Sequence, residues 1–357
     1  MKRFLLILVL FAVIAAGVVE WANVAWDVPG MPAINGKETV VLIAPRSRTH
    51  DIARMLEAKG ALKYGLLFEF DLRMRGLADK IKAGEYAIPS QASMGTIARI
   101  LVEGKSIQHK LTAAEGLTSD MIWKLVQADK VLVGDAGAAP AEGSLLPETY
   151  LFTRGETRAH LLARMAKAQE KFLDERWPDL KKSGRAQGLP FQSPREAVIL
   201  ASIVEKETSL PEERRHIAAV FINRLKIGMR LQTDPTVIYG LTRGYPLGRG
   251  IRQSELEGAT PYNTYVIAGL PPGPICNPGK DSLAAVLNPQ ASDDLFFVAT
   301  GHGGHVFAST ISAQARNVAA YRQVEAGART DNPPVPLPDA TTPKLPAAGH
   351  KRTPRHR

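Results

Sequence analysis

Hydrophobic positions divide the chain into one unbroken apolar segment near the N-terminus and a longer body in which apolar and polar residues are mixed. The segment from Phe4 to Val19 contains no charged or strongly polar residue. In the body, apolar residues recur at helical spacing in some stretches and form short runs typical of strands in others. This mixture of helices and short strands predicts an α+β fold class.

The first part of the body, residues 37–105, predicts a small α+β unit. Thr49 and Ser93 mark helix starts, and Gly60 and Gly104 follow as helix stops. The expected order is strand, helix, helix, strand and helix, at residues 39–44, 49–59, 63–75, 81–89 and 94–102.

Residues 106–190 predict a strand over 106–112, then a helix, and finally a long helix from Ala159 to Trp177. Between the two helices, residues 142–152 mix Gly, Pro, Glu and aromatic residues and are too irregular for a plain helix or strand. We expect either a shaped loop beside a cleft or an ordinary structural turn at this position.

The clearest helix pattern follows Ser193. Ser193 is suited to cap the helix, Pro194 fits the first helical position, and Glu196 stands where a capping box requires it. From residue 197 to residue 204 only Ser202 is polar. The helix is therefore apolar almost all round, and we expect it at the centre of a core.

Glu205 follows this apolar run directly, and Lys206 and Glu207 come next. A carboxyl held against apolar walls resists ionisation, because low dielectric penalises the charged form. Such a glutamate stays protonated near neutral pH and acts as a general acid. The alternative is that these residues are the solvated end of a core helix. On an ideal helix Glu207 points about 200° away from Glu205, so the two are not expected to share a site.

The next helix begins near Pro211, and its basic side chains are expected on the outer face: Arg214, Arg215, Arg224 and Lys226. Residues 228–279 are then rich in Pro, Gly, Asn and Thr. Such stretches make loops whose amide and hydroxyl groups bind neutral polar ligands such as sugars. Regular structure returns as a helix, two strands and a last helix, at 281–287, 295–300, 305–309 and 312–325.

The N-terminal apolar segment predicts an uncleaved membrane anchor over residues 1–22. Lys2 and Arg3 keep its start on the cytoplasmic side, and Trp21 and Trp26 are typical of a membrane interface. A cleaved signal peptide is the alternative, and under either interpretation the rest of the chain is exported.

Composition narrows the classes of partner. The 357 residues are 45% hydrophobic, enough for a packed core, and the formal net charge is +10. An anionic membrane surface or an acidic polymer suits this charge better than nucleic acid, because no compact basic motif with interleaved aromatic residues is present. Cys276 is the only cysteine, so no disulfide within the chain can form. Residues 328–357 are rich in proline and are expected to be disordered.

Several phrases occur together in one order and resemble the endolytic murein transglycosylase (YceG-like) family. They are Ala201-Ser-Ile-Val-Glu-Lys-Glu-Thr208, Gly228-Met-Arg-Leu-Gln-Thr-Asp-Pro-Thr-Val-Ile-Tyr-Gly240, Pro261-Tyr-Asn-Thr-Tyr265, Gly269-Leu-Pro-Pro-Gly-Pro-Ile275 and Gly303-Gly-His-Val-Phe307. The resemblance covers about residues 1–325. Residues 37–110, with the phrase Lys82-Ala-Gly-Glu-Tyr86, also resemble a LysM-like module, the compact peptidoglycan-binding unit.

The resemblance implies a single-pass protein of the inner (cytoplasmic) membrane whose catalytic domain faces the periplasm and cuts within new peptidoglycan strands. It implies that Glu205 is the catalytic residue. One carboxyl suffices for a lytic transglycosylase: it protonates the leaving oxygen, then takes the proton of the muramic acid 6-hydroxyl, which forms a 1,6-anhydro end. No cofactor or metal is expected. The expected partners are glycan strands, the membrane and peptidoglycan synthases.

The remaining predicted site residues would bind the glycan. The loops contribute most of them, the irregular stretch contributes one, and the helix end contributes another: Gln232, Thr233, Asp234, Asn263, Thr264, Tyr265, Glu148 and Glu207. Two other functions stay open. One is a hydrolytic muramidase that uses Asp234 as a second carboxylate, and the other is a non-catalytic glycan-binding scaffold of the synthesis machinery.

The expected domains follow from these patterns. They are an anchor, a linker, the LysM-like domain, a connecting region of the catalytic part, the transglycosylase domain and a disordered tail, over residues 1–22, 23–36, 37–110, 111–190, 191–327 and 328–357.

Overall fold

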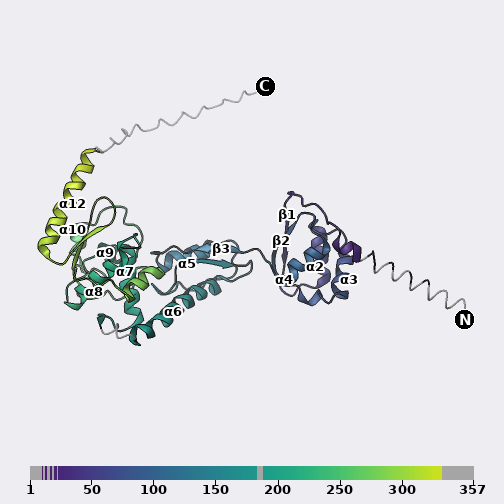
Figure 1. Ribbon diagram of the computed structural model, residues 1–357, viewed down its shortest axis with the longest axis horizontal. Helices are drawn as coiled ribbons and strands as arrows, with labels where there is room; N and C mark the ends of the chain where they lie inside the picture. The colour runs from purple at the N-terminus through teal and green to yellow at the C-terminus, as the bar shows by residue number, and fades with distance from the viewer. Residues whose placement is uncertain are drawn as a thin grey trace, which may run out of the picture. The chain divides into compact units, whose positions relative to one another are not determined.

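The structure is a computed structural model that describes residues 23–182 and 188–331, with residues 10, 13, 17, 20 and 21 (Figure 1). The chain divides into two compact units, the first ending at Asp293 and the second beginning at Asp294. The predicted anchor therefore lies almost wholly outside the described residues. Among the residues that are described, no helix is both long and apolar enough to cross a membrane.

The N-terminal part of the first unit contains the elements predicted for residues 37–105. Strands β1 and β2 pair antiparallel, with Val41 opposite Tyr86. The first two helices lie between these strands in the chain, a short 3-10 turn η1 precedes β2, and α4 follows it. The bounds are β1 Glu38–Ile43, α2 Thr49–Ala58, α3 Gly65–Met74, η1 Ala78–Lys80, β2 Gly84–Pro89 and α4 Met94–Glu103.

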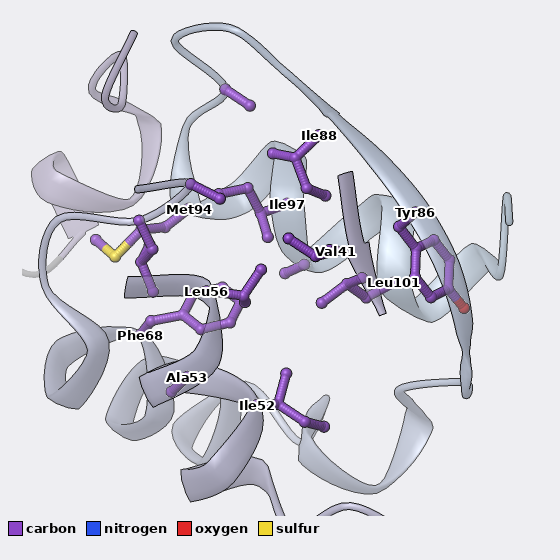
Figure 2. Packing of buried hydrophobic residues seen from close by; sticks show 14 of the residues in the cluster. Val41, Ile52, Ala53, Leu56, Phe68, Tyr86, Ile88, Met94, Ile97 and Leu101 are labelled. Atoms are coloured by element: carbon purple, nitrogen blue, oxygen red, sulfur yellow. The ribbon is translucent and has the colours of Figure 1, made fainter. Parts of the chain in front are cut away.

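One apolar core holds this part together (Figure 2). Leu56, Phe68 and Leu101 are fully buried in it. Trp26 also belongs to this core and stacks on Phe68 with ring centroids 6.2 Å apart. Trp26, expected at a membrane interface, and part of the predicted linker over 23–36 thus pack against the domain that follows.

The next part of the chain forms a second core beneath a two-stranded sheet. Strand β3 pairs antiparallel with β4; in the chain, α5 lies between these strands and α6 follows β4. The bounds are β3 His109–Thr112, α5 Ser119–Ala128, β4 Thr149–Phe152 and α6 Arg158–Lys182. The prediction of no regular structure over 142–152 is wrong for the last four residues. Tyr150 and Phe152 point inward while Thr149 and Leu151 are exposed, which is the alternation of a strand.

Helices α7, α8, α9 and α11 form the part that carries the candidate site. The Ser193 side chain accepts a hydrogen bond from the Glu196 N–H, as the predicted cap requires. Residues 234–242, expected as loop, form α9, because Asp234 and Pro235 suit a first helical turn and Val237 and Tyr239 are buried. The bounds are α7 Pro194–Glu207, α8 Arg214–Lys226, α9 Asp234–Thr242, α10 Gln253–Leu256 and α11 Lys280–Leu287.

The second unit consists of a hairpin and a helix. The predicted strands form β5 Phe296–Ala299 and β6 His305–Ala308, which pair antiparallel. Gly301, Gly303 and Gly304 have φ of 83°, 91° and 78° in the connecting turn, a conformation that favours glycine. Helix α12 spans Ile311–Asp331. Helix α12 therefore continues four residues into the range 328–357 expected for the disordered tail, and residues 332–357 lie outside the described part.

Candidate active site

Helix α7 carries Glu205 in its last turn. The eight residues before it, Ala197 to Val204, are all buried, as predicted. The Glu205 side chain is itself only 6% exposed. A carboxyl group is thus fixed directly after a run of eight buried residues.

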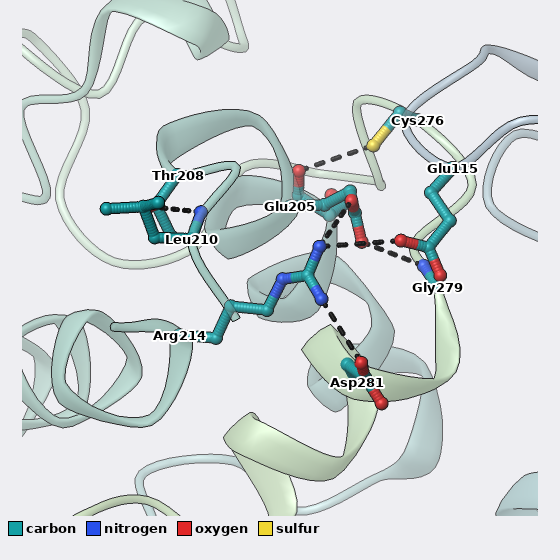
Figure 3. Close-up of polar contacts among 9 residues, drawn as sticks. Glu115, Glu205, Thr208, Leu210, Arg214, Cys276, Gly279 and Asp281 are labelled. Atoms are coloured by element: carbon teal, nitrogen blue, oxygen red, sulfur yellow. Dashed lines mark hydrogen bonds and ion pairs between the residues drawn. The ribbon is translucent and has the colours of Figure 1, made fainter. Parts of the chain in front are cut away.

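The surroundings of the Glu205 carboxyl differ from the apolar walls expected from the sequence. Its Oε2 accepts a hydrogen bond of 2.9 Å from the Gly279 N–H, and its Oε1 lies 3.6 Å from Nη2 of Arg214 (Figure 3). A cation and a hydrogen-bond donor both stabilise the ionised form of a carboxyl. The site is therefore built to hold a Glu205 carboxylate as well as to shield it from water.

Arg214 is the centre of the cluster, and its predicted outward position is wrong. It is 7% exposed, and its guanidinium also lies 3.4 Å from Oε2 of Glu115 and 3.3 Å from Oδ2 of Asp281 (Figure 3). Its Nε is buried and has no hydrogen-bond partner among the described residues. The helical pattern of α8 gave no sign of this burial, because all these partners lie in other elements. Arg224, also expected outward, is likewise buried, and its Nη1 donates to the Leu231 carbonyl.

Glu115 lies on the chain between β3 and α5 and was not predicted to belong to the site. Burial raises the pKa of its carboxyl, and the negative charge of Glu205 raises it further. Gly279 packs against the same carboxyl, because a Cβ at that position would overlap the Glu115 side chain. Glu115, Arg214 and Gly279 are thus the residues that the sequence interpretation missed.

The segment that holds Gly279 is anchored to α7. The Ser202 hydroxyl donates to the Ile199 carbonyl at 2.7 Å and accepts from the Ile275 N–H at 3.0 Å. The Cys276 thiol donates to the Ser202 carbonyl at 3.3 Å, and burial raises the pKa of this thiol well above its ordinary value. The one polar residue inside the apolar run therefore positions the loop that reaches Glu205.

Asn277 anchors the same loop to the opposite side of the site. Its Oδ1 accepts from the Leu145 N–H at 2.8 Å, and its Nδ2 donates to the Leu117 carbonyl at 3.1 Å. Its own carbonyl accepts from the Gly116 N–H at 3.1 Å. These bonds hold the Glu115 segment, the irregular stretch around residue 145 and the Gly279 loop in one arrangement.

The irregular stretch over 142–152 contributes a second enclosed carboxyl, Glu142. It accepts hydrogen bonds from the N–H groups of Ser119 and Gly143 and from the Tyr239 hydroxyl, at 2.9, 3.2 and 3.2 Å. Burial raises the pKa of this carboxyl in spite of these bonds. Glu142 thus connects α5 and α9 to the loop that precedes β4.

Glu207 faces away from Glu205, as the helix geometry predicts. Its carboxylate accepts a 2.7 Å hydrogen bond from the Thr233 hydroxyl. Thr233, Thr264 and Asn263 are buried, at 1%, 0% and 0% exposed. The Thr264 hydroxyl accepts from the Thr233 N–H, and the Asn263 amide donates to carbonyls of residues 255–258. The polar groups of these residues bind other parts of the chain.

The other predicted glycan-binding side chains are accessible. Gln232 and Asp234 are exposed, and the Tyr265 hydroxyl donates to Asp234 at 2.7 Å. Glu148 is exposed on the loop before β4 and pairs with Lys280, which lowers the pKa of its carboxyl. The negative charge of Glu148 raises the pKa of the Glu115 carboxyl, so Glu148 lies at the edge of the Glu205 cluster.

A cavity of about 510 Å³ adjoins the cluster through Arg214 and Asp281. Helices α6, α8 and α11 line it, and Arg176 and Arg215 add two more guanidinium groups to its wall. This cavity offers room for a ligand group beside Arg214 and Asp281.

Several known proteins are similar to this chain over much of its length. The YceG-like family matches residues 41–320. An endolytic murein transglycosylase of Streptococcus pneumoniae strain D39 is 29% identical over 336 residues, covering 80% of this chain and 59% of that protein. One of Bacillus subtilis strain 168 is 38% identical over 173 residues, covering 48% of this chain and 45% of that protein. The crystal structure of a YceG-like protein from Listeria monocytogenes superposes with a TM-score of 0.50 at 29% identity, covering 78% of this chain and 98% of that one. The chain thus spans about half to three fifths of the length of these two transglycosylases.

Proposed function

Because this chain belongs to the YceG-like family, we propose that it is a lytic transglycosylase that cleaves the bond between N-acetylmuramic acid and N-acetylglucosamine within peptidoglycan strands. The name shared by the relatives of S. pneumoniae and B. subtilis supports this activity. The observation that carries the proposal is the buried Glu205 carboxyl, which is held by Arg214 and the Gly279 N–H.

In the first step, protonated Glu205 gives its proton to the glycosidic oxygen as the bond to the anomeric carbon breaks. The Glu205 carboxylate that remains is stabilised by the Arg214 guanidinium and the Gly279 N–H. In the second step, this carboxylate takes the proton of the 6-hydroxyl, whose oxygen bonds to the anomeric carbon. Glu205 is thereby reprotonated by the 6-hydroxyl, while the first proton leaves with the released sugar hydroxyl. One carboxyl thus serves both steps, whereas ordinary glycoside hydrolysis needs two.

Substrate contacts are proposed for the accessible residues alone. Gln232, Asp234 and Tyr265 offer amide, carboxylate and aromatic groups at the surface, and Glu148 borders the cluster. The two helices between paired strands β1 and β2 support a LysM-like role in holding glycan for the N-terminal part. The apolar segment from Phe4 to Val19 supports a single-pass anchor in the inner membrane, with the catalytic part in the periplasm near the synthases.

The test is Glu205→Gln, which keeps the shape of the side chain but removes its acid. We expect release of anhydro-muropeptides from isolated sacculi to fall by at least about a hundredfold, the loss typical of a missing general acid. Glu212→Gln is the matched control, because Glu212 is an exposed glutamate in the turn before α8. Mass analysis of the products identifies the reaction.

Two outcomes contradict the proposal. If Glu205→Gln were as active as the wild type, Glu205 would not be the catalytic acid. If neither protein released products, a glycan-binding scaffold would be favoured. Products with a reducing end, heavier by one water, would instead indicate a hydrolytic muramidase. The Asp234 carboxylate is bonded to Tyr265 and lies outside the Glu205 cluster, which favours the non-hydrolytic reaction.

A further inference from the structure

Two carboxyl groups from distant parts of the chain share one nitrogen of Arg214. Nη2 lies 3.6 Å from Oε1 of Glu205 and 3.4 Å from Oε2 of Glu115 (Figure 3). Glu115 is 43% exposed, whereas Glu205 is 6% exposed. The buried carboxyl therefore has a partly solvated carboxyl as its competitor for the same cation.

Gly279 fixes both carboxyl groups at once. Its N–H donates to Glu205, while its Cα faces the Glu115 side chain with no room for a Cβ. The bond from the Gly116 N–H to the Asn277 carbonyl keeps the two chain segments together. The backbone arrangement, together with the charge of Arg214, thus keeps Glu115 close to Glu205.

The charges around Glu115 come from three helices and one loop. The groups that act on its carboxyl are Glu205 of α7, Arg214 of α8, Asp281 of α11 and Glu148 of the loop before β4. The Lys206 side chain, including its Nζ, lies near Gly116, and Lys280 is paired with Glu148. Asp281 is 71% exposed, so water screens it more than it screens Glu115. The Arg214 guanidinium thus faces three carboxyl groups, and a negative charge on Glu115 competes with Glu205 for it.

We propose that Glu115 is a positioning residue for the proposed transglycosylation, acting through Arg214 to keep on Glu205 the proton that the first step requires. This inference rests on the function proposed above. When Glu205 has given up its proton, Arg214 stabilises the carboxylate until the 6-hydroxyl returns a proton to it. Glu115 itself exchanges no proton with the substrate, and no further reactant is needed.

The test is the pH dependence of kcat/KM for Glu115→Gln, measured with the full chain in detergent on purified sacculi. Without the negative charge of Glu115, the Arg214 guanidinium interacts more strongly with the Glu205 carboxylate and stabilises it. The alkaline limb of the profile should therefore move to lower pH by about half to one unit. Glu115→Asp keeps the charge and should leave the limb closer to that of the wild type.

Two results would overturn the proposal: an unshifted limb in a folded Glu115→Gln variant, or an equal shift in Asp281→Asn, whose carboxylate contacts the same guanidinium from solvent. If Glu115→Gln does not fold, Gly279→Ala decides, because it keeps both carboxyls and the N–H donor but pushes Glu115 away. The limb should again move to lower pH, and no movement would also overturn the proposal. An active Glu205→Gln would instead refute the proposed function, so the two failures are distinguishable.

Discussion

At the scale of single residues, enclosed carboxyl groups are the main feature of the site. Glu205 is matched by a cation and a backbone donor, but Glu142 accepts only neutral donors. A buried carboxyl without a cation is easier to keep protonated than ionised. Its effect on stability is therefore a function of pH.

Burial raises the folded-state pKa of Glu142 above its unfolded value, so the folded protein holds a proton that the unfolded chain has lost. Stability should fall as pH rises through the window between the two pKa values. We expect Glu142→Gln to reduce the loss of Tm between about pH 5 and about pH 8 by on the order of 2 °C. Thermal unfolding followed by circular dichroism at both pH values measures this difference.

Glu148→Gln is the control for this prediction. Lys280 lowers the pKa of Glu148, so its stabilising effect is lost only as pH falls below the ordinary value of 4.5. Its Tm difference between the two pH values should equal that of the wild type. A Glu142→Gln protein with the same loss as the wild type would contradict the proposed cause.

The interaction partners of single residues were the feature hardest to predict from the sequence. Arg214 lies 99 residues from Glu115 and 67 from Asp281 in the sequence, and no local pattern reports contacts at such separations. Asn263 and Thr264 have the composition of sugar ligands, yet their polar groups satisfy the backbone and side chains of neighbouring loops. Glu205 stood out because the buried run before it is a local feature.

At the scale of elements, α7 acts as the support on which the site is assembled. Ser202 is fully buried and is the residue through which the helix holds the Ile275 N–H. Ser202→Ala would leave this N–H buried without its acceptor, at a cost of about 1–3 kcal/mol in the free energy of unfolding. We also expect a fall in kcat, because the Gly279 loop is held less firmly. Urea unfolding and turnover of sacculi measure the two effects.

Ser193→Ala is the matched control on the same helix. It removes the cap at the opposite end and should cost about 1 kcal/mol with kcat unchanged. Equal effects of the two substitutions on kcat would mean that Ser202 acts only through helix stability.

Most elements could be predicted because caps, stops and periodicity are local. Ser193 and Ser93 cap α7 and α4 as expected. Two of the misses, β4 and α9, lie in stretches whose Gly and Pro content suggested loops. Each of these elements buries a tyrosine, Tyr150 in β4 and Tyr239 in α9. These tertiary contacts override the local composition.

At the scale of the whole molecule, two apolar cores without a common residue stabilise the N-terminal part and the part around β3 and β4. Leu56 and Leu145 are fully buried in one core each. Leu56→Ala should cost about 2–5 kcal/mol in the free energy of unfolding and lower the transition temperature of the N-terminal part. Leu145→Ala should lower the transition temperature of the part around β3 and β4. Differential scanning calorimetry resolves this. One common transition shifted equally by both would show that the cores unfold as a unit.

The lone cysteine gives the site a natural reporter. Cys276 is fully buried next to Glu205, and its thiol is kept neutral by burial. An alkylating reagent reacts with the thiolate in contact with solvent, so it modifies this residue only when the 275–279 segment detaches from α7. The alkylation rate of the native chain therefore measures how often the 275–279 segment opens, and no label has to be introduced.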